Sequence, residues 1–221
     1  MAFHYEKHDF MIDILDYQAG NMLSLYRALE FLGISFRVIN SYDQINSKLL
    51  IIPGVGSFSS ASLLLKEQGF FELSKLSPNE RPFIIGICLG MQLLFSKGNE
   101  GGASDGLNLM DGEVVKITNQ SNDLLIPNTL IGWEEISLAQ NNNLNWLLKF
   151  SEYSFYHIHS YMCLPSIKED IIATYPNPYS FIPTIVGSLQ KRVLGFQFHP
   201  EKSAKKGLDF LDKSIKFAVN S

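Results

Sequence analysis

The chain has 221 residues, of which 46% are hydrophobic and 18% are charged, a composition typical of a globular domain. Its formal net charge of -4 argues against a general binder of nucleic acid or of anionic membranes. We predict one domain over residues 1–221, with a loose polar leader at 1–10 and no membrane span. Two cysteines make no disulfide framework and no signal peptide is visible, so we expect a reducing, cytoplasmic setting.

The first half of the chain alternates predicted strands and helices. Apolar runs typical of buried strands cover 11–16, 36–40, 49–52 and 83–87. Helices are predicted between and after them, at 22–32, 57–68 and 89–95. This alternation predicts an α/β fold with a doubly wound, mostly parallel sheet and flanking helices. In such sheets the chemistry gathers at the carboxyl ends of the strands.

Beyond Gly98 the pattern changes to short extended segments. Strands are predicted at 112–117, 131–136, 155–161, 171–175, 184–190 and 193–198. A polar hairpin loop is expected at 118–127 and a short helical patch at 145–150. A helix at 206–219, apolar on one face, follows the last strand. We therefore expect an antiparallel C-terminal extension of the same sheet.

Cys88 stands at the corner between the predicted strand 83–87 and the helix that follows it. Gly86 and Gly90 lie two residues to either side, which is the spacing of a nucleophile elbow with cysteine in place of serine. The glycines permit a strained corner residue and a close approach of the flanking backbones. The first turn of the helix favours a thiolate, and the amide of Leu89 would point to where an oxyanion forms. A buried structural cysteine is the alternative, and the two glycines favour the catalytic interpretation.

A thiolate nucleophile needs a base, and the base needs a group that orients it. His199 is the best candidate for the base, because it ends a predicted strand and Pro200 fixes the direction of the chain after it. In an extended segment Glu201 would project to the same side as His199 and could hold its other ring nitrogen. The alternative is an ordinary surface turn of the sequence His-Pro-Glu.

Two further features lie near the predicted site. Pro53-Gly54-Val55-Gly56 follows a buried strand and could supply the other half of an oxyanion hole, or form a tight turn or a phosphate cradle. No nucleotide-binding glycine motif accompanies it. Gln92 lies one helical turn after Cys88, so it could bind substrate or only pack. The pair His157 and His159 could hold a metal, but alternate residues on a strand explain it better, and we predict no metal and no cofactor.

Taken together, these motifs resemble those of class I (triad) glutamine amidotransferases. The segments 86–92 and 195–203 carry the resemblance through Gly86-Ile87-Cys88-Leu89-Gly90-Met91-Gln92 and Gly195-Phe196-Gln197-Phe198-His199-Pro200-Glu201-Lys202-Ser203. Within this superfamily the chain is similar to the glutaminase subunits of imidazole glycerol phosphate synthase. That narrower likeness rests on Asp16-Tyr17 with Gly20-Asn21, Pro53-Gly54-Val55-Gly56 with Phe58, His159-Ser160-Tyr161 and Glu201-Lys202-Ser203.

The resemblance implies a function and further site residues. It implies that Cys88 attacks the side-chain amide of L-glutamine, that His199 and Glu201 complete the triad, and that ammonia passes to a synthase subunit with a TIM-barrel fold, held as a heterodimer. That synthase makes imidazole glycerol phosphate and an aminoimidazole carboxamide ribotide in histidine biosynthesis. The resemblance further implies an oxyanion hole of Leu89, Gly54, Val55 and Gly56, a glutamine pocket of Gln92, Glu100, Ser160 and Tyr161, and a partner interface of Tyr17, Asn21, Trp133 and Lys202.

Two segments differ from the pattern of these subunits. Gln18 stands where the family usually has glycine, and Asn128-Thr129-Leu130-Ile131 differs from the usual residues before Gly-Trp. Both lie on the side expected to face the synthase. An alternative is therefore a paralogous glutaminase that supplies ammonia to a sugar amidotransferase. A third hypothesis is a catalytically silent binding subunit, which the intact Cys88, His199 and Glu201 disfavour.

Overall fold

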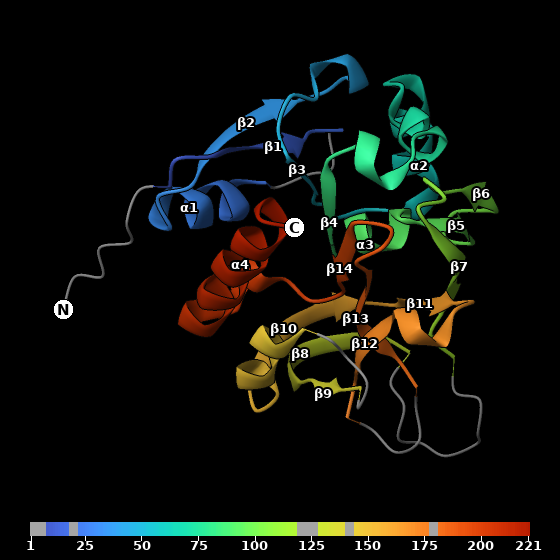
Figure 1. Cartoon of the computed structure of the whole chain (residues 1–221). Coiled ribbons are helices and arrows are strands. Elements are labelled where there is room, and N and C mark those ends of the chain that lie inside the picture. Colours follow the sequence, from blue (N-terminus) through green and yellow to red (C-terminus); the bar gives the residue numbers. More distant parts are fainter. Residues whose placement is uncertain (1–7, 18–21, 119–127, 140–143, 177–180) are drawn as a thin grey trace.

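The computed structural model describes residues 8–17, 22–118, 128–139, 144–176 and 181–221. In this part of the chain the main sheet has eight strands (Figure 1). In spatial order they are β2 (Ser35–Ile39), β1 (Met11–Leu15), β3 (Leu49–Ile52), β4 (Phe83–Ile87), β14 (Val193–Phe196), β13 (Pro183–Ser188), β12 (Ile171–Thr174) and β9 (Ser137–Leu138). The strands from β2 to β14 are parallel, and β13, β12 and β9 continue the sheet in antiparallel fashion. The predicted mostly parallel sheet with an antiparallel extension is confirmed.

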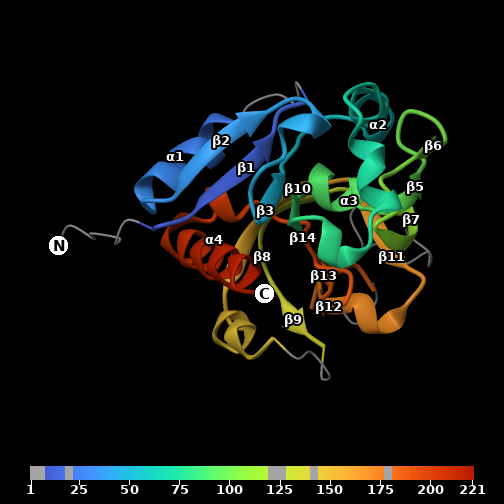
Figure 2. The same ribbon diagram turned by 45° about the horizontal axis from the view of Figure 1, so that its top comes forward.

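Helices cover both faces of this sheet (Figures 1 and 2). α1 (Leu23–Phe31) and α4 (Ala204–Val219) pack on one face, and α2 (Phe58–Glu67) and α3 (Leu89–Leu93) on the other. Strand β3 shows why its sequence is apolar throughout: Leu49 and Ile51 join the first core, and Leu50 and Ile52 the second. The doubly wound arrangement follows from this burial on both sides.

Part of the second half departs from the expected extension. Strands β8 (Leu130–Glu135) and β10 (Ser154–His159) form a separate antiparallel pair. A further sheet contains β11 (Tyr161–Pro165), β7 (Met110–Lys116), β5 (Phe95–Gly98) and β6 (Ser104–Asp105). The prediction that all of this region extends the main sheet is wrong for these strands. The inner residues of the four-stranded sheet, Val114 and Cys163, lie in the core shared with α2 and α3. In the β8–β10 pair, Phe155 joins the core on the opposite face of the main sheet and Leu130 a small separate cluster.

Two predicted boundaries were also wrong. The helix expected at 89–95 ends at Leu93, and Phe95 already begins β5. A short apolar run does not distinguish helix from strand by periodicity. The strand expected at 155–161 breaks at Ser160, where the chain leaves β10 and enters β11 of another sheet. The loop predicted at 118–127 lies outside the described residues except for Thr118.

The other predicted elements match the structure within one or two residues, whereas β6 and β9 were not predicted. A 3₁₀ helix occupies Asn145–Phe150, and α4 buries one face that includes Phe210, Leu211 and Ile215. No helix in the described ranges has the length and apolar character needed to cross a membrane.

Candidate active site

Cys88 connects β4 to α3 in a strained conformation. Its φ of 53° and ψ of -109° lie where residues with a side chain rarely occur. A Cβ atom at Gly90 would overlap the carbonyl oxygen of Ile52, and one at Gly86 would lie 2.5 Å from the carbonyl oxygen of Gly90. Only glycine therefore fits at these two positions, and the nucleophile-elbow geometry is present. Helix α3 has only 5 residues. The positive field at Cys88 therefore comes from the N–H groups of the first turn and not from the dipole of a long helix.

His199 reaches this corner through the pairing of β14 with β4. Phe196 lies opposite Ile87, and the amide of Cys88 donates a 2.7 Å hydrogen bond to the carbonyl oxygen of Phe196. The imidazole is buried, and its Nδ1 lies 2.7 Å from Oε1 of Glu201. The hydroxyl of Ser203 holds the same turn by donating to the carbonyl oxygen of His199 at 2.6 Å. The predicted contact between His199 and Glu201 is present, but a 3₁₀ turn at Pro200–Lys202 makes it, not an extended segment.

The charges around His199 favour its protonated form. Burial alone would lower the pKa of His199, but the Cys88 sulfur and the Glu201 carboxylate outweigh burial and raise that pKa to about 10. Within the described residues, Nε2 of His199 makes no hydrogen bond of ordinary geometry. The arrangement places a protonated imidazole, which can give its proton to a leaving group, beside the Cys88 sulfur.

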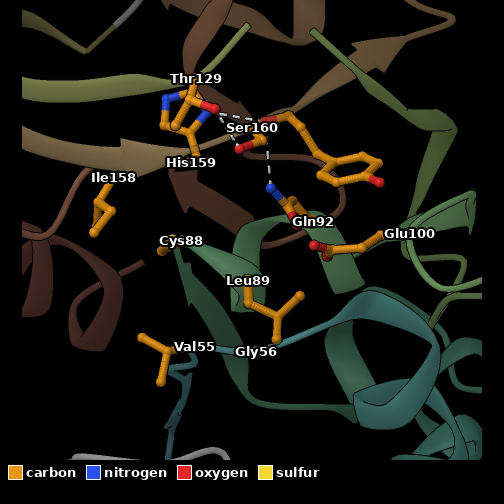
Figure 3. Close-up of a pocket in the computed structure, with 11 residues that line it drawn as sticks. Val55, Gly56, Cys88, Leu89, Gln92, Glu100, Thr129, Ile158, His159 and Ser160 are labelled. Carbon is orange, nitrogen blue, oxygen red and sulfur yellow. Dashed lines mark hydrogen bonds between the residues drawn. The ribbon is translucent and has the colours of Figure 1, made fainter.

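A pocket of about 300 Å³ opens beside Cys88. Val55, Gly56 and Leu89 lie on one side of it, and Ile158 and His159 of β10 lie on the other (Figure 3). Its remaining lining residues include every residue predicted to bind glutamine: Gln92, Glu100, Ser160 and Tyr161. Sequence elements that lie far apart thus enclose one cavity next to the nucleophile.

The loop Pro53–Gly56 borders this pocket and is held from below by Tyr17. The hydroxyl of Tyr17 donates to the carbonyl oxygen of Pro53 at 2.7 Å, and a Cβ atom at Gly54 would overlap that hydroxyl. Burial, with smaller contributions from Cys88 and Asp16, raises the pKa of Tyr17 well above its ordinary value, so the hydroxyl stays a donor. Gly56, at φ 118°, faces open space. Gly54 borders a smaller adjacent cavity, which also contains His199, Glu201 and Lys202.

Glu100 has a structural contact as well as a place in the pocket. Its Oε2 accepts a 3.0 Å hydrogen bond from the amide of Phe58, the first residue of α2. Ser57, at the N-cap position, provides no side-chain cap, so Glu100 takes that role from a distant loop. Burial raises the pKa of Glu100.

Gln92, for which the sequence left binding and packing open, lies at the pocket and also makes contacts within the protein. It lines the pocket, and its Nε2 lies 3.4 Å from the carbonyl oxygen of Tyr161 and 3.4 Å from Oε1 of Gln197. Gln197 in turn directs its Nε2 at Sγ of Cys88, 3.8 Å away. The sequence pattern indicated no role for Gln197, although this residue lies two residues before His199 and so on the same side of an extended chain.

Thr129 was also missed. Its Oγ1 lies 2.8 Å from Oγ of Ser160, and both residues line the pocket. The sequence offered Thr129 only as part of a segment that differs from the family pattern.

The residues predicted at a partner interface differ in their exposure to solvent. Trp133 is 52% exposed, its ring meets that of Tyr156 edge to face, and Lys202 is exposed. The side chain of Tyr17 is buried, not on the surface. Asn21 lies outside the described residues. Ile131 and Ile158, paired across β8 and β10, add exposed apolar surface beside Trp133.

The pair His157 and His159 is buried on β10, as expected for alternate strand residues. Nδ1 of His157 lies 3.3 Å from Nε2 of His159, and Nδ1 of His159 lies 2.8 Å from the carbonyl oxygen of Tyr161. Burial lowers the pKa of His157 to about 3 and that of His159 to about 4. Among the residues with described positions, no group of three or more His, Cys, Asp or Glu could hold a metal ion.

Comparison with known proteins places this geometry in context. The family model "Glutamine amidotransferase class-I" matches residues 13–216. The chain is 39% identical to imidazole glycerol phosphate synthase subunit HisH 1 of Campylobacter jejuni, over 91% of this chain and 98% of that protein. It is 34% identical to imidazole glycerol phosphate synthase subunit HisH of Geobacillus thermodenitrificans, over 93% of this chain and 95% of that protein.

Solved structures agree on the fold. The structure of PurLQS from Thermotoga maritima aligns with a TM-score of 0.69 at 18% identity, over 94% of this chain and 98% of that chain. A crystal structure of a glutamine amidotransferase aligns with a TM-score of 0.65 at 19% identity, over 92% of this chain and 97% of that chain.

Proposed function

The chain belongs to the class I glutamine amidotransferases, and from this we propose that it is the glutaminase subunit of imidazole glycerol phosphate synthase. It hydrolyses L-glutamine to glutamate and ammonia and delivers the ammonia to a synthase subunit. The observation that carries the proposal is the strained Cys88 beside a buried His199–Glu201 pair, at the mouth of a pocket of about 300 Å³. The intact triad disfavours a catalytically silent subunit.

The chemistry follows from the three side chains. The Cys88 thiolate attacks the side-chain carbonyl carbon of glutamine, a C–S bond forms, and the negative charge moves to the carbonyl oxygen. When the tetrahedral intermediate collapses and the carbonyl group re-forms, the C–N bond breaks. The His199 imidazolium gives its proton to the departing nitrogen, which leaves as ammonia. A water molecule then attacks the thioester and passes a proton to His199, and the C–S bond breaks to release glutamate. Glu201 holds Nδ1 throughout and stabilises the imidazolium.

The oxyanion of both tetrahedral intermediates needs hydrogen-bond donors. We assign this role to the amide of Leu89 together with the loop Gly54-Val55-Gly56. The glycines allow the loop to turn its amides toward the pocket, and the exposed Val55 leaves room for that movement. We propose that a substrate-loaded partner favours the inward orientation, so that the isolated chain turns glutamine over slowly. Gln92, Glu100, Ser160 and Tyr161 hold the glutamine in the pocket.

The partner is proposed to be the TIM-barrel synthase subunit, in a heterodimer. The two HisH relatives are subunits of imidazole glycerol phosphate synthase, and Trp133, Ile131 and Ile158 offer an exposed apolar surface of the kind buried in stable interfaces. Lys202, next to Glu201 in the chain, is assigned to the same interface, as is Asn21. Both cysteines are free, which fits a cytoplasmic enzyme.

The test is to mix the purified chain with a histidine-pathway synthase subunit and its phosphorylated ribulosyl nucleotide, and to follow glutamine-dependent formation of imidazole glycerol phosphate. We expect a one-to-one complex and a large rise in glutamine hydrolysis. Trp133→Ala should weaken the complex at least tenfold without changing the melting temperature, whereas Leu148→Ala, an exposed residue elsewhere, should leave it unchanged. The proposal is wrong if no complex and no glutamine-dependent product form while the chain is active with a sugar amidotransferase. The chain would then be the paralogous glutaminase that supplies ammonia to that enzyme.

A further inference from the structure

Gln197 touches the reacting sulfur, and no step of the proposed triad uses it. Its side chain is fully buried, and its Nε2 lies 3.8 Å from Sγ of Cys88, within the range of an N–H···S hydrogen bond. Phe196 and Phe198 point to the core under α4, so Gln197 and His199 share the opposite side of the chain, toward Cys88. Two polar side chains from the end of β14 thus converge on one thiol.

The hydrogen bonds around Gln197 fix which end of its amide faces the sulfur. The main-chain carbonyl oxygen of Tyr161 is only an acceptor, so the Gln92 atom 3.4 Å from it is the donor Nε2. The Gln197 atom that faces this nitrogen must then be the acceptor Oε1, at 3.4 Å. Nε2 of Gln197 is therefore left for Cys88. The donor and acceptor of each of these three hydrogen bonds are therefore fixed by the carbonyl oxygen of Tyr161.

From this network we propose that Gln197 is a further functional residue of the glutaminase, which donates a hydrogen bond to the Cys88 thiolate and links it to Gln92 on the pocket wall. Cys88 is almost fully buried, and a buried anion needs donors. The charge of the His199 imidazolium stabilises this anion, but His199 surrenders a proton during each turnover. Gln197 has no charge to lose, so it stabilises the thiolate whether His199 is protonated or neutral.

The other titratable groups near Cys88 are less suited than Gln197 to donate a hydrogen bond to its thiolate. The titratable groups around the Cys88–His199 pair are Glu201 after β14, Tyr17 after β1, His157 and His159 on β10, Cys163 on β11 and Glu100 at the pocket. Of these, Tyr17 donates its hydroxyl hydrogen to the carbonyl oxygen of Pro53, and Nδ1 of His159 faces the carbonyl oxygen of Tyr161. Burial keeps Cys163 a thiol, whose S–H is only a weak donor, and the carboxyl group of Glu100 already accepts from the amide of Phe58. Gln197 is the neutral donor that the described structure aims at the sulfur.

The experiment measures the pH dependence of Cys88 alkylation by iodoacetamide in the isolated chain, because only the thiolate reacts. The midpoint belongs to the Cys88–His199 pair. Gln197→Leu keeps the approximate size and removes the donor, and should move the midpoint upward by about one pH unit, with about a tenfold loss of glutaminase kcat/KM at neutral pH. Gln197→Glu, which places a carboxylate beside the sulfur, should move it further. Gln190→Glu makes the same change of charge at an exposed position and should leave the midpoint unchanged.

Cys163 provides an internal control for folding, because it is fully buried and reacts only when the chain opens. If Gln197→Leu exposes Cys163, Gln197→Glu carries the test. A midpoint that stays at the parent value in either folded variant, even with lower activity, would overturn the assignment and leave Gln197 a packing residue. The inference rests on the proposed role of Cys88. Failure of the parent chain to alkylate at Cys88 would count against that function, whereas an unchanged midpoint counts only against Gln197.

Discussion

The hydroxyl of Tyr17 donates a 2.7 Å hydrogen bond to the carbonyl oxygen of Pro53 and so connects the chain after β1 to the loop after β3. The two residues come from neighbouring parallel strands, and their contact lies directly under Gly54. Tyr17 is among the residues that the family resemblance implies at the partner interface. If it lies there, this bond connects that interface to the loop whose amides we assign to the oxyanion hole.

Tyr17→Phe should therefore loosen the loop. Removing one buried hydrogen bond of about 1 kcal/mol lowers the cost of turning the amides inward, so glutamine hydrolysis by the isolated chain should rise about fivefold, with less further activation by the synthase. Steady-state release of glutamate, with and without synthase, measures this. Tyr153→Phe, at a tyrosine whose ring packs on Phe150 and not on the Pro53–Gly56 loop, is the matched control. An equal activation ratio in parent and Tyr17→Phe would argue against the link.

Gly54→Ala should have the opposite effect. The new methyl group overlaps the hydroxyl of Tyr17, so the loop must shift, and we expect at least a tenfold fall in glutaminase activity. The double variant Gly54→Ala with Tyr17→Phe removes the overlapping oxygen and should regain part of the loss. If the second substitution restores nothing, the overlap is not the cause.

A glutamine-like electrophile should label Cys88 and spare Cys163. Cys88 opens on the pocket, whereas Cys163 is fully buried, and burial, with a smaller contribution from Cys88, raises the pKa of Cys163 well above its ordinary value. Cys88→Ala should abolish hydrolysis and Cys163→Ala should retain most of it. Peptide mass spectrometry locates the label; modification mainly at Cys163 would remove Cys88 from the mechanism.

Glu201→Gln should reduce stability most at neutral and acidic pH. The pKa of His199 is raised from an ordinary 6.5 to about 10, so the stabilisation from its partners is complete below about 6.5 and is lost as the pH rises through about 10. The variant loses a charge-assisted hydrogen bond of about 2 kcal/mol. The difference in free energy of unfolding between parent and variant, measured in urea, should be largest at pH 6 and narrow toward pH 10. A difference that is constant over this range would contradict the ion pair.

His157→Phe should make the protein less sensitive to acid. Buried histidines with a lowered pKa stay neutral in the fold, while the unfolded chain takes up protons below about 6.5, so stability falls as the pH drops toward their folded pKa values of about 3 and about 4. Each such residue accounts for a loss of about 2 kcal/mol between pH 7 and pH 5. The variant, which keeps His159, should lose roughly half as much as the parent over this interval. Equal losses would show that His157 is protonated in the fold.

The sequence predicted the parts of the site that depend on local spacing. Gly86 and Gly90 are required by contacts with each other and with Ile52, within a few residues of Cys88 or on the next strand, so the elbow was visible from the pattern. The sheet class was equally accessible, because burial on both faces forces continuous apolar runs. His199 was found from its place at a strand end before Pro200, and its contact with Glu201 was predicted from an extended segment, whereas a 3₁₀ turn makes it.

The sequence did not reveal what depends on packing between distant elements. Gln197 reaches Cys88 only through the register of β14 against β4. The break at Ser160 was hidden because apolar alternation continues across it and only the neighbouring strands change. The burial of Tyr17 depends on the path of the Pro53–Gly56 loop above it, which no local pattern reports.

The pairing of β14 with β4 also has a consequence for the order in which the enzyme is made. Gln197 and Cys88 are 109 positions apart, and the strand that carries the first is synthesised long after the elbow that carries the second. Until β14 inserts between β4 and β13, the thiol has neither its imidazole nor its amide donor. A nascent chain that lacks β14 therefore has Cys88 without these two partners. The activation that we propose for Cys88 needs the long-range closure of the sheet, which comes late in synthesis.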